Sequence, residues 1–462
     1  MKKKTNHQDP TYNIMTIGCQ MNQADSERLA ALLISRGFAP ADIQQAGTVI
    51  LNTCGVRQMA EDRVYGLVDQ IKRRHPRTKV VITGCLSRRP DVQERLDGRA
   101  DIFLPINEML QLPELLAGEK FNPYYSLEEV RQSAGEKYLQ IPPRYQSRFS
   151  AYVPIGNGCN NFCAYCVVPY ARGREVYRPA QDVLQEVRGL VKAGYKEIVL
   201  IAQNVNSYRD GKYDFPWLLR QLVKMPGKFW LRFASSHPKD MSDELIKVIG
   251  ASSKVCPHLH LAVQSGDDQI LQAMNRKYKA AAYERLIRKV RAARPGIAIT
   301  TDVIVGFPGE TKAQFMNTVK LFKKLNFDLA YIAQYSPRPG TAAAKLKDNV
   351  SPAEKKRRAH FLNEVLKETA LKNKQKYFGK TVEVLVEGKN KRGKYYGKTG
   401  DYNTVLIKTS AGPNAKARSG LIGEFVKVKI DKVLAFGLEG LTVAAFRKHK
   451  QPVARKNKKD RK

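Results

Sequence analysis

The sequence has no long apolar run. Nowhere in its 462 residues do about 18 apolar residues follow one another, which is the length that a membrane-spanning helix needs. Its start carries Lys2, Lys3 and Lys4 but no apolar stretch that would serve as a secretory signal. Seven cysteines are an odd count in a large chain and argue against a disulfide framework. We therefore expect a cytoplasmic protein whose cysteines act as thiolates.

Acidic residues are scarce beside the basic ones. Lys and Arg number 80 against 43 Asp and Glu, so the formal net charge is +37. Such an excess favours a polyanionic partner, with nucleic acid as the first candidate. The alternative is that the lysines are solvated on the surface and only aid solubility. The hydrophobic share of 43% provides for packed cores, and the length suggests about three domains.

Residues 11–137 alternate short apolar runs with helical stretches. This pattern predicts an α/β domain with an open parallel sheet and right-handed crossovers. The expected strands are Ile14–Ile17, Thr48–Leu51, Val80–Ile82 and Ile102–Leu104. The alternation runs to about Asn107, and a less periodic stretch with several prolines, from about Leu116 to Ser147, is expected to be a linker.

The alternation returns in residues 146–378. Six strand-like runs with helices between them predict an open (β/α)6 barrel. A charged helix with Ser351 as its cap and Pro352 at its first position ends this part. Residues 379–446 read as strands around glycine turns and predict a small all-β barrel. The basic tail, residues 447–462, is expected to be disordered.

Cys159, Cys163 and Cys166 stand in a C-x3-C-x2-C spacing after the first expected barrel strand. Three thiolates on one tight loop can hold three irons of a 4Fe–4S cluster and leave the fourth iron open. A structural zinc site would need four ligands, and no fourth Cys or His lies nearby in the sequence. A chance trio of buried cysteines is the remaining alternative.

A second trio, Cys19, Cys54 and Cys85, follows three expected strands of the first domain. The carboxyl ends of neighbouring parallel strands form one ligand crevice, so these thiols can converge there. The spacing predicts a second three-thiolate cluster, with three buried structural cysteines as the alternative. The seventh cysteine, Cys256, is expected to be a small buried hydrophobe.

The loop Gly158–Tyr170, with Arg172 and Gly173 after it, resembles the cluster loop of radical S-adenosylmethionine (SAM) enzymes, and within them that of the methylthiotransferases. Gly18–Asn22, Asn52–Cys54 and Gly84–Cys85 are similar to the amino-terminal domain of that family. Further matching strings are Gln203–Asn206, Ser235–Pro238, Val263–Gly266, Met274–Arg276 and Ile304–Glu310. The carboxyl-terminal barrel resembles TRAM, a small RNA-binding domain.

The resemblance implies SAM and two 4Fe–4S clusters as cofactors. It implies that Cys159, Cys163 and Cys166 hold the cluster that binds SAM, and that Cys19, Cys54 and Cys85 hold an auxiliary cluster linked to sulfur donation. The residues in these motifs are most similar to those of the branch that adds a methylthio group to carbon 2 of isopentenyl-adenosine in tRNA. A low-potential donor such as a flavodoxin or ferredoxin would supply the electron.

Polar residues at the expected barrel strand ends are candidates for binding SAM, because barrel enzymes place their active sites there. These candidates are Gln203, Ser235, Gln264, Arg276 and Asp302. Lysines that grip phosphates and tyrosines that stack on bases suggest an RNA-binding hairpin. The hairpin residues are Lys391, Arg392, Lys394, Tyr395 and Tyr396.

Other functions remain open. The family also contains members that modify threonylcarbamoyl-adenosine in tRNA or an aspartate of a ribosomal protein, although the net charge of +37 weighs against a protein substrate. A non-enzymatic RNA-binding iron–sulfur protein is the third alternative, but it would leave an open iron without a purpose. His258 and His260 alternate along one expected strand and are interpreted as core histidines rather than ligands.

Overall fold

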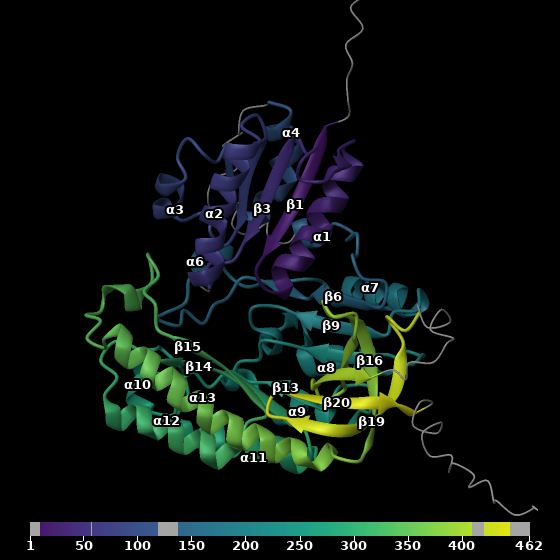
Figure 1. Ribbon diagram of the computed structural model, residues 1–462, viewed down its shortest axis with the longest axis vertical. Helices are drawn as coiled ribbons and strands as arrows, with labels where there is room; N and C mark the ends of the chain where they lie inside the picture. Colours follow the sequence, from purple (N-terminus) through teal and green to yellow (C-terminus); the bar gives the residue numbers. More distant parts are fainter. Residues whose placement is uncertain (1–9, 57, 119–136, 409–419, 444–462) are drawn as a thin grey trace, which may run out of the picture.

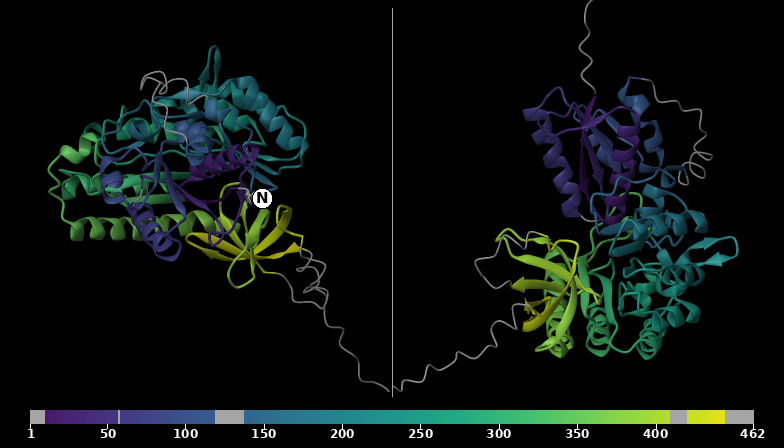
Figure 2. Two further views of the ribbon diagram at one scale, coloured as in Figure 1. Left: turned by 90° about the horizontal axis from the view of Figure 1, so that it is seen from above. Right: turned by 90° about the vertical axis from the view of Figure 1, so that its right-hand side faces the viewer.

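The computed structural model describes residues 10–56, 58–118, 137–408 and 420–443. An amino-terminal α/β unit stands above a central barrel, and a small β-barrel lies beside the central barrel (Figure 1). Two further views show that the small barrel packs against one side of the central barrel (Figure 2). The expected fold class is confirmed. Among the described residues, no helix is long and apolar enough to cross a membrane.

The amino-terminal unit is a parallel sheet with the order β2-β1-β3-β4-β5. Its strands are β1 (Thr11–Ile17), β2 (Ala39–Pro40), β3 (Thr48–Thr53), β4 (Lys79–Gly84) and β5 (Ile102–Leu104). Helices α1 (Gln20–Ser35) and α2 (Gln58–Arg74) follow β1 and β3. Every residue of β3 is buried, because Ile50 packs into one core and Val49 and Leu51 into another.

The central barrel has six parallel strands that do not close. They are β6 (Ser150–Pro154), β9 (Glu197–Ile201), β12 (Trp230–Phe233), β13 (His258–His260), β14 (Ala298–Val305) and β15 (Leu329–Gln334). They form two three-stranded sheets, β12-β9-β6 and β13-β14-β15. Parallel bridges join Leu231 to Val255 and Ser236 to Leu261, so β12 and β13 are neighbours. The six expected strands therefore all form.

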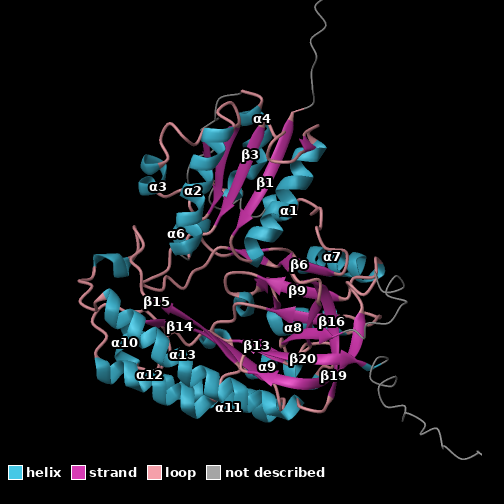
Figure 3. Ribbon diagram, in the orientation of Figure 1, coloured by secondary structure: helices cyan, strands magenta, loops and turns pink. Residues whose placement is uncertain are grey.

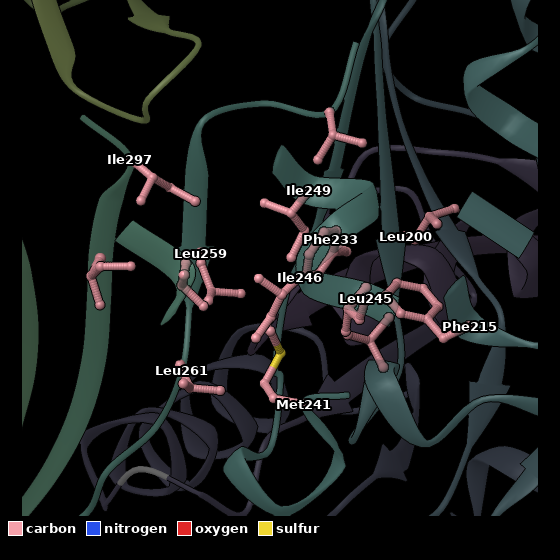
Figure 4. Packing of buried hydrophobic residues seen from close by; sticks show 14 of the residues in the cluster. Leu200, Phe215, Phe233, Met241, Leu245, Ile246, Ile249, Leu259, Leu261 and Ile297 are labelled. Carbon is pink, nitrogen blue, oxygen red and sulfur yellow. The ribbon is translucent and has the colours of Figure 1, made fainter. Parts of the chain in front are cut away.

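Helices cover the outside of this barrel (Figure 3). They are α7 (Ala180–Lys192), α8 (Phe215–Val223), α9 (Asp243–Ala251), α11 (Ala280–Ala293), α12 (Lys312–Leu325) and α13 (Pro352–Lys374). The core between strands and helices is apolar, and Figure 4 shows Leu200, Phe215, Phe233, Leu245 and Leu259 among its buried side chains. Ser351 caps α13 by accepting from the backbone N–H of Glu354, as the sequence predicts.

The carboxyl-terminal unit is a closed barrel with the order β16-β17-β18-β20-β19. Its strands are β16 (Thr381–Lys389), β17 (Tyr395–Thr399), β18 (Thr404–Lys408), β19 (Phe425–Leu434) and β20 (Gly437–Thr442). The apolar pattern of the sequence predicts only three of these strands, β16, β18 and β19, at Thr381–Val386, Thr404–Ile407 and Phe425–Leu434. Glycines at 397, 437 and 440 weaken the pattern of the other two strands.

Shorter elements lie between these strands and helices. They are α3 (Pro90–Arg95), α4 (Leu112–Leu116), β7 (Gly156–Asn157), α6 (Val168–Arg172), β8 (Val176–Tyr177), β10 (Arg209–Asp210), β11 (Tyr213–Asp214) and α10 (Asp268–Ala273). Helix α1 packs on the barrel, because Met21 and Ala24 lie in one apolar cluster with Val199 and Ile201 of β9. The expected tail, residues 447–462, and most of the expected linker lie outside the described residues.

Candidate active site

The amino-terminal cysteines lie at the carboxyl ends of three adjacent parallel strands. Ile17, Thr53 and Gly84 are register partners across β1, β3 and β4, and the three cysteines follow within two residues. Gly84 has a φ of +82°, and a Cβ there would lie 2.4 Å from the carbonyl oxygen of Thr53. Only glycine fits this close approach, which brings the loop of Cys85 against that of Cys54.

Buried amides hold this edge of the sheet in place. The Asn22 side chain donates to Asn52 Oδ1 at 2.9 Å and to the carbonyl of Thr53 at 3.0 Å. Asn52 donates in return to the carbonyl of Asn22 at 2.8 Å. Asn22 Oδ1 accepts from the backbone N–H of Cys19 at 3.1 Å, so the first cysteine is tied to the other strands. These hydrogen bonds fix the positions of the cysteine-bearing loops.

The loop of Cys159, Cys163 and Cys166 lies between β7 and α6 and is held by the segment after α10. Asn275 donates to the carbonyl of Phe162 at 2.8 Å, and Arg276 Nη1 lies 3.4 Å from Cys163 Sγ. Phe162 and Asn275 have φ values of +45° and +57°, which are strained for residues with a side chain. Such strain is concentrated at functional sites.

The environment of these cysteines suits a metal centre. Burial raises the pKa of Cys166 to about 12, and the neighbouring cysteines Cys163, Cys159 and Cys85 add to the effect. Burial also raises the pKa of Cys159. Both effects disfavour the free thiolate, and a bound iron would overcome them because a metal ion favours the deprotonated sulfur. Three thiols on one short loop, like the three at the strand ends, are the donor set that iron–sulfur clusters take.

The two trios of cysteines face each other. A Cβ at Gly55, next to Cys54, would lie 3.3 Å from Cys85 Cβ and 3.4 Å from Val167 Cγ2. Val167 directly follows Cys166, so the amino-terminal strand ends meet the cysteine loop of the barrel.

In the described part of the chain, no three His, Cys, Asp or Glu side chains are grouped to hold a single metal ion. A zinc ion would bring its sulfur ligands within about 3.8 Å of one another, given bonds of about 2.3 Å.

Strain and unpartnered polar atoms mark the barrel strand ends. Ser235 and Gln264, two of the expected SAM-binding residues, have φ values of +66° and +67°. Within the described residues, Gln203 Oε1, Asn204 Oδ1 and Ser236 Oγ are buried without a hydrogen-bond partner. Buried polar atoms normally have partners, so these atoms fit a polar ligand such as SAM. Asn204 and Ser236 are additions to the set expected from the sequence, which contains only their neighbours.

Arg276 and Asp302 are already engaged within the protein. Besides its contact with Cys163, the Arg276 guanidinium donates to Tyr278 Oη at 2.9 Å and to the carbonyl of Ala262 at 2.8 Å. Asp302 is half exposed and lies 3.1 Å from His260 Nε2. Arg276 thus orients the cysteine loop, a role that the sequence motif did not reveal.

His258 and His260 both contact Thr300 Oγ1, at 2.9 and 3.0 Å, and therefore share one face of β13. Burial lowers the pKa of His258 well below its usual value. Cys256 is buried and stands apart from both trios, and burial raises its pKa to about 12. Cys256 is thus the buried residue that the sequence predicts, whereas both histidines are only partly buried.

The expected RNA-binding hairpin needs one correction. Tyr395 begins β17 and is buried in the core of the small barrel, so it is not exposed for base stacking. Successive residues of a strand face opposite sides, which leaves Tyr396 on the outer face. Lys391, Arg392 and Lys394 are exposed at the turn before β17.

Three known families match this chain in the order of its structural units. Residues 11–104 match the uncharacterized protein family UPF0004, residues 153–322 the radical SAM superfamily, and residues 375–443 the TRAM domain. Among solved structures, the radical SAM methyltransferase TsrM from Kitasatospora setae gives a TM-score of 0.56 at 17% identity. That match covers 73% of this chain and 75% of TsrM, and it supports the fold alone.

Relatives in sequence are much more similar. The tRNA-2-methylthio-N(6)-dimethylallyladenosine synthase of Carboxydothermus hydrogenoformans is 40% identical over 447 residues, which cover 94% of this chain and all of that protein. The synthase of the same name from Bacillus velezensis is 38% identical over 93% of this chain and 85% of its own length. With both cysteine trios in place and this identity over nearly its whole length, the chain belongs to the radical SAM methylthiotransferases, enzymes that use SAM and two 4Fe–4S clusters.

Proposed function

We propose that this enzyme adds a methylthio group to carbon 2 of isopentenyl-adenosine next to the anticodon in tRNA. The observation that carries this proposal is the 40% identity, over nearly the whole chain, to synthases named for that product. The pairing of two cysteine trios across one interface supports it, because the reaction needs both SAM and a sulfur source. We expect the reaction in the cytoplasm, where tRNA is modified.

We assign Cys159, Cys163 and Cys166 to the SAM-binding cluster and Cys19, Cys54 and Cys85 to the auxiliary cluster. When bound, these clusters and SAM supply the radical chemistry and the sulfur. The chain holds and orients them: Arg276 and Asn275 fix the cysteine loop, and the Asn22–Asn52 hydrogen bonds fix the amino-terminal strand ends. Apolar packing of α1 on β9 helps to exclude water from the space between them.

The barrel strand ends provide the groups that we assign to SAM. Gln203, Ser235 and Gln264 lie at successive strand ends, and the unpartnered oxygens of Gln203 and Ser236 offer hydrogen bonds to a polar ligand. Asp302 lies on β14 with its carboxylate half exposed. Arg276 acts on SAM through the cysteine loop that it holds rather than by a direct ion pair.

The small β-barrel is proposed to bind the tRNA. Lys391, Arg392 and Lys394 are exposed at one turn, and Tyr396 lies on the outer face of β17. Exposed cations bind phosphates without reading sequence, so this barrel would position the tRNA while the central barrel receives the adenosine. A low-potential flavodoxin or ferredoxin is the proposed electron donor.

The test is anaerobic incubation of the protein with SAM, dithionite and tRNA that carries isopentenyl-adenosine. Mass spectrometry of the nucleosides should show the methylthio product. The variant with Cys19→Ala, Cys54→Ala and Cys85→Ala should still cleave SAM to 5′-deoxyadenosine but form no product. Cys256→Ala, which removes a buried cysteine outside both trios, is the matched control and should retain both activities.

Parallel reactions use tRNA with threonylcarbamoyl-adenosine and ribosomal protein as substrates. Methylthio transfer to either of these, with none to isopentenyl-adenosine, would contradict the proposed substrate. Transfer by the amino-terminal triple variant would contradict the role given to its three cysteines.

A further inference from the structure

Two buried arginines of the central barrel reach into the amino-terminal unit. Arg172, at the end of α6, donates to Asp25 Oδ2 of α1 at 2.6 Å. The side chains of this pair are only 2% and 0% exposed. Arg172 also donates to Asn157 Oδ1 at 3.0 Å, which ties α6 to the strand before the cysteine loop. Cys19 directly precedes α1, the helix that carries Asp25, so Arg172 joins the two cysteine-bearing loops.

Arg338 makes a similar connection from the loop after β15. Its Nη2 donates to the carbonyl of Val56 at 3.1 Å, two residues after Cys54. Its Nη1 donates to Gln58 Oε1 at 2.6 Å. The side chain is 7% exposed. Arg338 therefore holds the segment that links Cys54 to α2.

The charge of Arg338 is not neutralised by a carboxylate of its own. Glu61 lies 3.5 Å away, but Glu61 already pairs with both terminal nitrogens of Arg89, at 2.6 and 3.0 Å. Arg89 has a second carboxylate partner, Asp91, whereas in the described residues Arg338 has only the shared and more distant Glu61 within ion-pair distance. A buried cation whose carboxylate partner is shared and distant is costly unless another negative group lies close to it.

The sulfurs of the amino-terminal trio lie within electrostatic range of these two arginines. Burial opposes the charged form of Arg172, but Asp25, then Cys85, Tyr138 and Cys19, outweigh it and raise the Arg172 pKa well above its usual value. Burial and Arg89 lower the pKa of Arg338, while Glu61, Cys54 and Asp62 act in the opposite direction. Each of the three cysteines therefore interacts with a positive charge that comes from the barrel.

We propose that Arg172 and Arg338 are positioning residues that complete the amino-terminal cysteine site from the barrel side and raise the reduction potential of the cluster held there. Reduction adds a negative charge to a cluster that three thiolates already make anionic. A buried guanidinium in a medium of low dielectric constant stabilises the reduced form more than the oxidised form. Net charge and burial around a cluster are among the factors that set its potential. This inference rests on the cluster assignment of the proposed function.

The test uses the full chain with Cys159→Ala, Cys163→Ala and Cys166→Ala, so that the amino-terminal cluster alone remains. The sample is poised anaerobically at the midpoint potential of this parent, and its electron paramagnetic resonance signal gives the ratio of reduced to oxidised cluster. Added Arg172→Gln or Arg338→Gln should lower that ratio at least tenfold, which corresponds to 59 mV for a one-electron couple. Arg172→Lys and Arg338→Lys, which keep the charge, should restore most of it.

Asp25→Asn should change the ratio of reduced to oxidised cluster in the opposite direction. It removes the negative partner of Arg172 and leaves the cation, so the ratio should rise. Loss of structure alone would move Arg172→Gln and Asp25→Asn in the same direction. The matched control is Arg358→Gln, a buried arginine of α13 whose partner Glu310 lies at 2.7 Å outside the cysteine site. It should leave the ratio unchanged.

The outcomes separate this inference from the function. About four irons per chain in the parent support the cluster assignment, and a parent without iron would overturn it. If the parent and both glutamine variants hold equal iron and show equal ratios, the inference alone is wrong. If Arg172→Gln fails to fold, the ratios of Arg338→Gln and Asp25→Asn test the inference. A fall in the ratio of reduced to oxidised cluster for Asp25→Asn would overturn the inference.

Discussion

Arg232 is expected to fasten the small β-barrel to the central barrel. Its side chain is 4% exposed and donates to Glu197 Oε1 at 2.6 Å within the central barrel. The same guanidinium donates to the carbonyls of Gly400 and Thr399 in the small barrel, at 2.7 and 2.8 Å. One side chain thus satisfies a buried carboxylate and two backbone acceptors across a domain boundary.

Arg232→Met removes all three hydrogen bonds and leaves Glu197 buried without its cation. Breaking a buried ion pair in this way costs about 3–5 kcal/mol. The control is Lys228→Met, since Lys228 pairs across the same boundary with Glu383 but is 68% exposed. Exposed pairs contribute about 0–1 kcal/mol, so this change should have little effect.

The assay is hydrogen exchange of the turn that joins β17 to β18, together with urea unfolding of the full chain. Arg232→Met should accelerate exchange there and lower the urea midpoint, and Lys228→Met should do neither. Arg232→Met combined with Glu197→Leu should recover part of the loss, because no buried charge is then left unpaired. Equal effects of Arg232→Met and Lys228→Met would refute this reasoning.

Three further predictions concern iron, pH and RNA. Iron analysis of anaerobically prepared protein should give about eight irons per chain. Cys159→Ala, Cys163→Ala and Cys166→Ala together should leave about half of this iron. An unchanged iron content in that variant would contradict the cluster assignment. Burial, with Arg276 and Lys239, lowers the pKa of His237 to about 2, so this residue is neutral in the folded protein. The unfolded chain binds a proton at this histidine as the pH falls below 6.5, so its contribution to stability is present above pH 6.5 and is lost as the pH decreases. Unfolding free energy should drop by about 1 kcal/mol on this account between pH 6.5 and 5.5, and His237→Asn should flatten that part of the profile. Alanine at Lys391, Arg392 and Lys394 should weaken tRNA binding. The slope of log affinity against log salt concentration should fall by about 1 for each phosphate that is no longer bound. Unchanged slopes in filter binding would exclude this turn from the interface.

The local pattern of the sequence was sufficient for the architecture and for the cysteines. Alternation of apolar runs with helical stretches predicted the parallel sheet and the six barrel strands, because each strand buries its own residues whatever its neighbours are. Cys19, Cys54 and Cys85 were recognisable because each follows a strand, and parallel strands end at one edge. The spacing of Cys159, Cys163 and Cys166 is itself a feature of the sequence.

Orientation within these elements could not be predicted as well. Tyr395 and Tyr396 are adjacent aromatics in a glycine-rich stretch, and the register of β17 in the closed barrel decides that Tyr395 faces inward. Arg276 was expected to meet SAM directly. That expectation stays a prediction, and the structure adds a contact that the motif did not reveal: the backbone turn at Asn275, whose φ is +57°, brings Arg276 to Cys163.

Only the tertiary structure decided which charges surround the cysteines. Arg172 and Asp25 are 147 positions apart in the sequence, and Arg338 and Gln58 are 280 positions apart. Such contacts form when α1 and the barrel dock through apolar packing, and a short sequence window carries no record of that docking. The sequence by itself determined which thiols are present and at which strand ends they lie. The docking of the two units decided which cations lie beside them, because a buried charge is stabilised by its neighbours in space and not along the chain.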